Sequence, residues 1–121
     1  MSLVPVSVLV VDDDNSFREV VGQLLTTRGF VIAGQAVDEH QALEAVQLLH
    51  PDAVLLDVHL AALDDFALIR RLSDEGGHIP VLLTSSDRDA ADACLAREYG
   101  AVGFVPKTEL ISADLRRYFN H

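Results

Sequence analysis

Short apolar runs alternate five times with segments of helical periodicity along the 121 residues of the chain. The runs are short enough to be strands, and they lie at residues 7–11, 30–36, 53–56, 79–83 and 102–105. After each run, apolar residues recur at the three- and four-residue spacing of an amphipathic helix. Strict strand–helix alternation predicts βαβ units, whose right-handed crossovers build a parallel sheet with helices on both faces.

The composition of the individual runs predicts the order of the strands. The runs at 8–11, 53–56 and 79–83 are apolar throughout, as expected of strands buried on both faces, whereas Gly34 interrupts the run at 30–36, which fits an edge. We therefore expect an α/β fold, a flavodoxin-like (βα)5 three-layer sandwich with a five-stranded parallel sheet in the order 2-1-3-4-5. In that order, ligands bind at the carboxyl ends of the first and third strands, where the winding reverses.

Capping residues predict the helix boundaries. Asp14 and Asp38 are placed to cap the first two helices, and Gly29 and Pro51 are placed to end them. We interpret Asp14 as a helix cap rather than as a metal ligand. The remaining helices are expected at about residues 64–72, 89–99 and 108–119.

Net charge and cysteine content restrict the partners and the compartment. A formal net charge of −10 argues against direct binding to nucleic acid or to an anionic membrane, because either would need a basic surface. The single Cys94 cannot form an internal disulfide and suits a reducing compartment. No apolar run reaches the roughly 20 residues of a membrane span. We expect a single cytoplasmic domain over residues 1–121, of a parent protein that can be longer than this chain.

Acidic residues end the two strands that flank the predicted crevice. Asp12 and Asp13 follow the first strand directly, and Asp57 follows the third. Carboxylates this close are tolerated when one is protonated or when a cation lies among them, so we expect a divalent-metal site around Asp57. Thr84 directly follows the fourth strand, so its hydroxyl is expected to face the crevice, and Lys107 lies two residues past the fifth. These groups together predict phosphoryl transfer to Asp57 as the nucleophile.

In this order and at these strand ends, the motifs resemble the receiver domain of two-component response regulators over essentially the whole chain. The resemblance is carried by the acid pair after residues 8–11, the aspartate after 54–56, the threonine after 80–83 and the lysine after 100–106. It implies that Asp57 is the phosphoacceptor and that Mg²⁺ is the cofactor. It assigns Asp13 and Asp57 as direct Mg²⁺ ligands together with the main-chain carbonyl of His59, and Asp12 as a ligand through water.

The resemblance also implies how the signal enters and leaves. A sensor histidine kinase or a phosphotransfer protein would supply the phosphoryl group, docking on the acidic surface and the first helix. Lys107 would pair with a phosphoryl oxygen, and Thr84 and Phe104 would be the switch pair. The hydroxyl would turn toward the phosphoryl group and the ring would fill the space it leaves. The output would be a shift of the face made by the fourth helix, the fifth strand and the last helix. Self-phosphorylation and autodephosphorylation at Asp57 are the only chemistry expected, so the domain is not otherwise an enzyme.

Two expectations concern the full-length protein. Residues 34–36 and 104–110 are similar to receivers that precede a helix-turn-helix domain, which is a hint of such a domain downstream and of a role in transcription regulation. A homodimer is also compatible with the family.

The chain departs from the family pattern beside the phosphoacceptor. The usual Pro, and a later Asp-Gly turn, are replaced by residues 60–65, which include Asp65 where a glycine often allows positive φ. We therefore expect this loop and the start of the next helix to differ from the family. We interpret the His59 ring as lining the site and tuning water access rather than as a ligand, because imidazole is softer than Mg²⁺ prefers.

Two other functions remain open. Residues 12–16 also resemble the nucleophile motif of haloacid-dehalogenase-type Mg²⁺ phosphatases, but that family needs a further acidic motif late in the chain, where only Glu109 and Asp114 are available. The other alternative is a pseudo-receiver, an interaction module that keeps the fold without phosphorylation. The altered loop favours it, and the retained acids, hydroxyl and ammonium argue against it.

Overall fold

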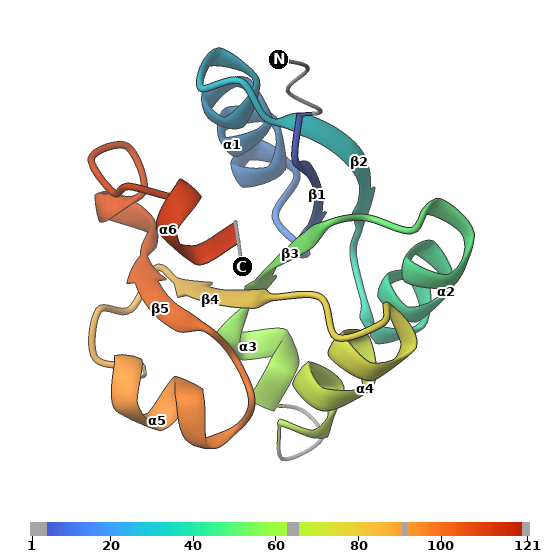
Figure 1. The fold of residues 1–121 in the computed structure, drawn as a ribbon. Helices are drawn as coiled ribbons and strands as arrows, with labels where there is room; N and C mark the ends of the chain where they lie inside the picture. Colours follow the sequence, from blue (N-terminus) through green and yellow to red (C-terminus); the bar gives the residue numbers. More distant parts are fainter. Residues whose placement is uncertain (1–4, 63–65, 91, 120–121) are drawn as a thin grey trace.

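A five-stranded parallel sheet forms the centre of the molecule (Figure 1). The computed structural model describes residues 5–62, 66–90 and 92–119. Its strands are β1 (Ser7–Val11), β2 (Val31–Ala36), β3 (Ala53–Asp57), β4 (Val81–Ser85) and β5 (Gly103–Pro106). The strands lie in the order β2-β1-β3-β4-β5, and every neighbouring pair is parallel. The predicted flavodoxin-like order is confirmed, and the weakest of the predicted strands is at an edge.

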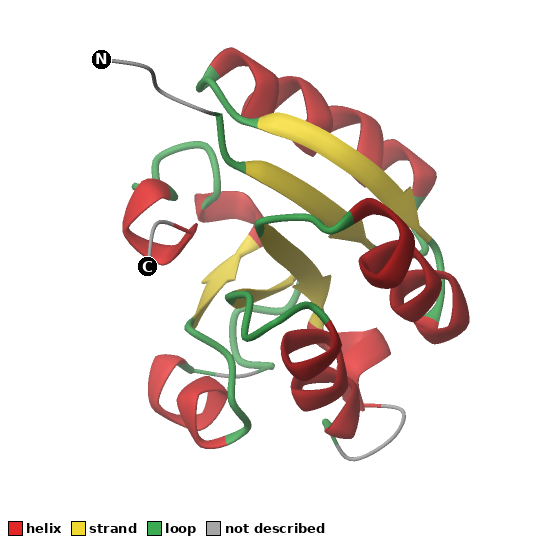
Figure 2. Ribbon diagram, turned by 45° about the vertical axis from the view of Figure 1, so that its right-hand side comes forward, coloured by secondary structure: helices red, strands yellow, loops and turns green. Residues whose placement is uncertain are grey.

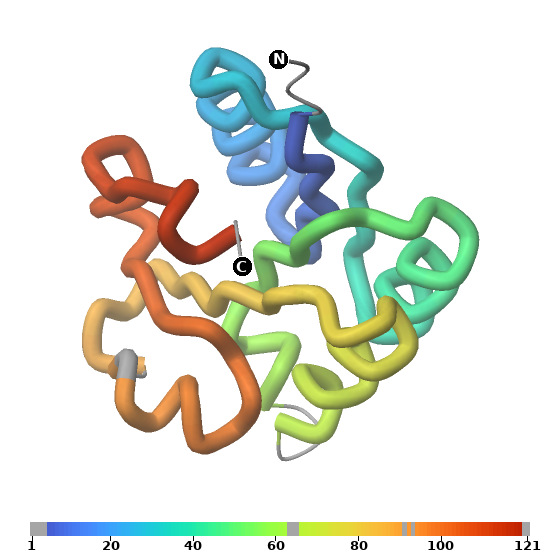
Figure 3. The backbone as a smooth tube through the Cα atoms, viewed as in Figure 1, coloured from blue at the N-terminus to red at the C-terminus, as the bar shows by residue number. Residues whose placement is uncertain are grey.

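Helices pack against both faces of the sheet, as Figure 2 shows. They are α1 (Asn15–Thr27), α2 (Glu39–Leu49), α3 (Val58–Ala61), α4 (Ala67–Glu75), α5 (Ala93–Glu98) and α6 (Arg116–Phe119), with a 3₁₀ turn η2 (Lys107–Glu109). Side chains of α1 and α6 form one core cluster with the sheet, and side chains of α2, α3, α4 and α5 form the other. In Figure 3 the chain begins at β1, passes to β2 at one edge of the sheet, and then returns through β3 and β4 to β5 at the other edge. Within the described parts of the chain, no helix has both the length and the hydropathy that a membrane span requires.

The central strands are apolar on both faces because each face meets a layer of helices. Side chains alternate along a strand, so Leu9 and Val11 enter one core cluster while Val8 and Val10 enter the other. β3 and β4 are buried along their whole length. Polar side chains are therefore confined to the ends of these strands, and the carboxyl ends open toward one edge of the sheet.

Asp14 and Asp38 cap α1 and α2, as the sequence predicted. The Asp14 carboxylate accepts hydrogen bonds from Ser16 N at 3.0 Å and Phe17 N at 3.4 Å, and the Asp38 carboxylate accepts one from Gln41 N at 2.8 Å. A side-chain cap of this kind stabilises a helix by about 1 kcal/mol. The first helix therefore begins immediately after the acid pair that ends β1.

The prediction of one continuous helix over residues 108–119 is wrong. Residues 107–109 form the turn η2, and α6 begins only at Arg116. Arg28, at the end of α1, donates hydrogen bonds to the carbonyl oxygens of Ala113 at 2.6 Å and Leu110 at 3.4 Å. In an unbroken helix, those carbonyls would accept from N–H groups four residues later. A side chain from the other end of the chain satisfies them instead.

The fourth helix is shorter than the predicted 89–99, because local hydrogen bonds hold the preceding segment in turns. The Ser85 hydroxyl accepts from Asp87 N at 3.0 Å, and the Asp87 carboxylate accepts from Asp89 N at 2.9 Å. Such side-chain contacts compete with helical hydrogen bonds. The helix α5 begins at Ala93, where the Asp92 carboxylate caps it.

The region after Asp57 differs from the sequence expectation in one further respect. The short helix α3, which the sequence did not predict, follows Asp57 directly. The predicted start of the third helix at residue 64, and Asp65, lie outside the described residues. The described part of that helix is α4, preceded by Phe66 with a φ of +67°.

Candidate phosphorylation site

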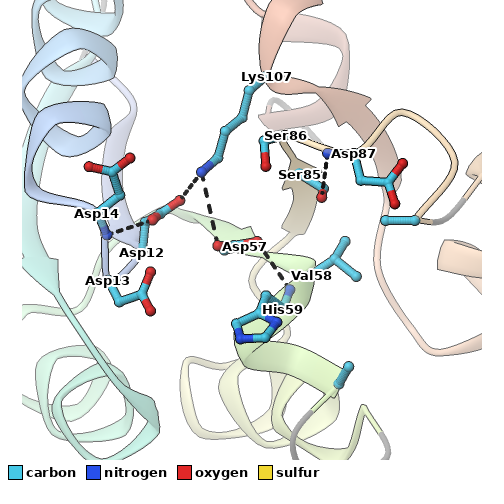
Figure 4. Close-up of a pocket in the computed structure, with 12 residues that line it drawn as sticks. Asp12, Asp13, Asp14, Asp57, Val58, His59, Ser85, Ser86, Asp87 and Lys107 are labelled. Carbon is cyan, nitrogen blue, oxygen red and sulfur yellow. Dashed lines mark hydrogen bonds and ion pairs between the residues drawn. The ribbon is translucent and has the colours of Figure 1, made fainter.

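A cavity of about 480 Å³ lies at the carboxyl edge of the sheet, where β1, β3, β4 and β5 end (Figure 4). It is lined by the predicted acids Asp12, Asp13 and Asp57, and by His59 and Lys107. These residues are brought together because β1 and β3 are neighbours and in register, and because β5 ends on the same side of the sheet. The fold therefore brings these residues together at the predicted edge of the sheet.

Asp12 is the most deeply placed acid of the site. It is fully buried, and its Oδ1 accepts a hydrogen bond from Asp14 N at 2.8 Å. Its Oδ2 lies 2.8 Å from Lys107 Nζ. A buried carboxylate is costly unless it is paired, so this ion pair accounts for the tolerance of a charge at this depth.

Asp57 is buried beside the same lysine. Its Oδ1 accepts a hydrogen bond from His59 N at 3.0 Å, and its Oδ2 lies 4.0 Å from Lys107 Nζ. Burial raises the pKa of the Asp57 carboxyl above its ordinary value, and the charges of Asp12 and Asp13 act in the same direction. The hydrogen bond from His59 N and the charge of Lys107 lower the pKa in part. The net result is a carboxylate that favours a further positive charge beside it.

The three acids meet the requirements of a Mg²⁺ site. Asp12, Asp13 and Asp57 each offer a carboxylate oxygen, and these oxygens all lie within 4.8 Å of one another. Mg²⁺ prefers hard oxygen ligands and keeps several of its own waters, which the exposed side of Asp13 allows. A divalent cation would also relieve the repulsion that raises the pKa of Asp57.

Lys107 connects the acids to the first helix. It opens η2 directly after β5, and its side chain is 16% exposed. In Figure 4 it extends across the cavity toward Asp12 and Asp57. Its ammonium also lies 4.0 Å from the centroid of the Phe17 ring in α1.

The expectation that the Thr84 hydroxyl faces the crevice is corrected by the structure. Thr84 is level with Asp57 on the neighbouring strand, but it is fully buried and its hydroxyl donates to the carbonyl of Val105 at 2.7 Å. Among the described residues that line the cavity, Ser85 and Ser86 are present and Thr84 is not. The hydroxyl points toward β5 because the main-chain carbonyl of Val105 lies within hydrogen-bond distance. The strand pattern of the sequence alone does not reveal this acceptor.

The remaining predicted residues have mixed outcomes. His59 lines the cavity, as expected, and its role in tuning water access stays a prediction. The role of its main-chain carbonyl in metal binding stays a prediction. Phe104 is partly buried and packs against the core cluster of α2 to α5, on the strand next to Thr84.

Arg18 is a site residue that the sequence analysis missed. Its guanidinium donates to the main-chain carbonyl of Asp12 at 2.7 Å, to Gln35 Oε1 at 3.1 Å and to Asn15 Oδ1 at 3.0 Å. It thereby ties the end of β1 to β2 and to the start of α1. Its acceptors are a main-chain carbonyl and two neutral side-chain amides, which the sequence pattern does not reveal.

The chain is similar in sequence to response regulators. The family model for the response regulator receiver domain matches residues 8–117. The response regulator MprA of Mycolicibacterium vanbaalenii is 33% identical over 113 residues, which cover 93% of this chain and 48% of MprA. The transcriptional regulatory protein CseB of Streptomyces avermitilis is 38% identical over 118 residues, which cover 92% of this chain and 49% of CseB. The chain thus spans about half the length of these relatives.

The fold is also similar to solved structures. One of them is the P1 domain of CheA3 in complex with CheY6 from R. sphaeroides. The matched chain has a TM-score of 0.73 and 27% sequence identity, and the match covers 85% of this chain and 82% of that one. The arrangement of acids, lysine and parallel strands therefore occurs in a chain that resembles receivers in both sequence and fold.

Proposed function

The chain belongs to the family of response regulator receiver domains, which are signalling domains, and we propose that its phosphoacceptor is Asp57. The observation that carries the proposal is the position of Asp57: a buried carboxylate at the end of β3, flanked by two further acids and by Lys107, and lining a cavity. The family membership disfavours the phosphatase, and the described cluster of acids and lysine disfavours the pseudo-receiver.

The proposed reaction is an in-line transfer of a phosphoryl group. A carboxylate oxygen of Asp57 attacks the phosphorus of the donor, a new P–O bond forms, and the bond to the donor breaks with its electron pair leaving on the donor. The attacking form is the ionised carboxylate, which Lys107 and the N–H of His59 favour against burial. The acyl phosphate is later cleaved by water. We propose no chemistry beyond self-phosphorylation and autodephosphorylation at Asp57.

The proposed metal ligands are Asp13 and Asp57 directly, the main-chain carbonyl of His59, and Asp12 through a water. Bound Mg²⁺ supplies neutralisation of the charge that develops on the phosphoryl oxygens. Lys107 is proposed to pair with another of those oxygens, which requires a short movement of its ammonium away from the Asp12 carboxylate at 2.8 Å. The His59 ring and Ser86 line the path by which water reaches the acyl phosphate.

The proposed switch begins with the Thr84 hydroxyl. Phosphorylation at Asp57 places acceptor oxygens beside β4, and the hydroxyl exchanges the carbonyl of Val105 for a phosphoryl oxygen. Phe104 then moves into the space that the hydroxyl leaves. Because both residues lie on the last two strands, the change is passed to the face formed by α5, β5 and α6, which we propose as the output surface.

The proposed phosphodonor is a sensor histidine kinase or a phosphotransfer protein. The complex of CheY6 with the P1 domain of CheA3 supports this kind of partner. A small apolar groove of about 110 Å³ lies beside the site, lined mainly by α1 and the segment after η2. Val20 and Ile111 on its rim are 65% and 69% exposed. We propose this groove, together with the acids of the neighbouring phosphorylation cavity, as the docking surface for that partner.

The proposed setting is a cytoplasmic response regulator longer than this chain. Residues 1–121 would form its single receiver domain, and the coverage of about half of MprA and CseB supports an additional output domain. The name of CseB supports transcription regulation as the output, through a helix-turn-helix domain rather than through this acidic domain itself. A homodimer stays a prediction.

The test is intact-mass spectrometry after incubation with acetyl phosphate and Mg²⁺. One phosphoryl adduct is expected in the wild type and none in Asp57→Asn or in metal-free buffer. An adduct that survives Asp57→Asn but is lost in Asp12→Asn would favour the phosphatase. Complete absence of an adduct, under conditions that label CheY6, would favour the pseudo-receiver.

A further inference from the structure

Among the described residues, two carboxylates and an aromatic ring lie close to the ammonium of Lys107. Asp12 Oδ2 lies at 2.8 Å, Asp57 Oδ2 at 4.0 Å and the centroid of the Phe17 ring at 4.0 Å. The two carboxylates compete for the charge, and the nearer one holds it. From this arrangement we infer that Phe17 is a positioning residue, whose ring face holds the Lys107 ammonium at the point where it can pass from Asp12 to a group on Asp57.

The ring is well placed to act in this way. A cation within about 6 Å of a ring centroid is attracted by the negative face of the ring, and the attraction grows when water is excluded. The side chain of Lys107 is only 16% exposed, so the contact is largely shielded from water. Unlike a second carboxylate, the ring attracts the ammonium without fixing one hydrogen-bond direction. The ammonium therefore stays free to turn between its two acidic partners.

The ring is also tied to the acids through the chain itself. Phe17 N donates to the Asp14 carboxylate at 3.4 Å, and Asp14 N donates to Asp12 Oδ1 at 2.8 Å. The start of α1, the buried acid and the ring thus form one connected unit. A change in the position of this helix start moves the ring and the carboxylate together, and Lys107 follows both.

Lys107 separates the two cavities near the site. It lines the phosphorylation cavity on one side, and it lines the apolar groove together with Phe17 on the other. A leucine in place of Phe17 would still fill apolar space in the groove, but it would have no electron-rich ring face to attract the ammonium. The positioning effect therefore belongs to the ring and can be separated from hydrophobic packing.

The experiment uses the fact that Lys107 is the only lysine in the sequence. Selective ¹³C,¹⁵N-lysine labelling gives one set of side-chain signals, in which the Hε protons of Lys107 should show an upfield ring-current shift. We expect the shift in the wild type and in Phe17→Tyr, and its loss in Phe17→Leu. Phe30→Leu is the matched control, because it removes the same atoms beside a different cation, Arg116, at 5.5 Å.

The kinetic part rests on the proposed function and is measured with acetyl phosphate at saturating Mg²⁺. The phosphorylation rate is expected to fall on the order of fivefold in Phe17→Leu, and to stay near the wild-type rate in Phe17→Tyr and Phe30→Leu. A lysine signal that is the same in the wild type and Phe17→Leu, or equal rates in the two, overturns the inference. Absence of phosphorylation in the wild type overturns the proposed function instead, while the lysine spectrum still decides the contact.

Discussion

The two sides of the phosphorylation cavity are built differently. On the side of β1, a long, capped helix follows the acids, and Asp12 is held by Asp14 N, Lys107 and, at its carbonyl, Arg18. On the side of β4 and β5, the helices α5 and α6 span only six and four residues, and side-chain hydrogen bonds hold turns beside them. The acidic half is therefore preformed, because a capped helix and direct contacts hold Asp12 in place. The carboxyl-terminal half has weaker elements that can rearrange.

The largest expected effect separates Lys107 from Thr84. Lys107→Met removes the positive charge that reaches from the end of β5 to Asp12 and Asp57, so the rate of labelling by acetyl phosphate should fall roughly 10²- to 10³-fold. Thr84→Val acts on the adjustable half and removes one hydrogen bond, so labelling should fall by less than about tenfold. Arg88→Met, which breaks an exposed ion pair with Glu109, is the control and should leave the rate unchanged. Equal losses in the lysine and threonine variants would contradict the division into two halves.

A smaller effect, on the free energy of unfolding, should identify the contacts that stabilise the carboxyl-terminal half. Arg28→Met leaves the carbonyls of Leu110 and Ala113 without their donor, and we expect a loss of roughly 1–3 kcal/mol in the free energy of unfolding. Hydrogen exchange should accelerate at residues 110–119 and stay slow in β1. Arg71→Met removes an exposed ion pair with Glu39 and is expected to cost less than about 1 kcal/mol. Uniform acceleration over the whole sheet would show that Arg28 acts on global stability.

The smallest effect concerns the charge of Asp57. Because burial raises its folded-state pKa, the stability that this group contributes is fully present below its ordinary pKa of 3.8 and is lost as the pH rises through the folded-state pKa. Asp57→Asn avoids that loss, so its free energy of unfolding should exceed that of the wild type at pH 7, and the difference should vanish below pH 3.8.

Mg²⁺ should reduce the stability difference between these two proteins. At ten times its dissociation constant, the ion is expected to add about 1.4 kcal/mol to the wild type and less to Asp57→Asn. Urea unfolding followed by circular dichroism, with and without Mg²⁺ between pH 3 and 8, measures both effects. A difference in the free energy of unfolding between Asp57→Asn and the metal-free wild type that does not grow as the pH rises to 7 would contradict the raised pKa of Asp57.

The preformed half was predictable from sequence because its determinants are local. Asp12 and Asp13 directly follow a run of apolar residues, and the rule for parallel sheets places the end of that run beside Asp57. The cap at Asp14 is likewise a contact with residues two and three positions later. The position of Lys107 follows from the same rule, since it comes just after the last strand.

The adjustable half was predicted less well because its determinants lie far away in the chain. Helical periodicity continues through residues 108–119, yet Arg28 takes the carbonyls that would join the turn to the helix. The direction of the Thr84 hydroxyl depends on an acceptor in the neighbouring strand. The contact between Phe17 and Lys107 joins residues that the sequence shows only as an apolar helix position and a strand end.

The sequence by itself determined the strand order, the helix caps and the edge at which Asp12, Asp13, Asp57 and Lys107 meet, because these follow from burial periodicity and from the handedness of βαβ units. Only the tertiary structure decided which partner each polar group takes. Hydrogen-bond donors and acceptors are satisfied by whatever lies within about 3 Å in the folded chain, and that neighbour can come from any position in the sequence.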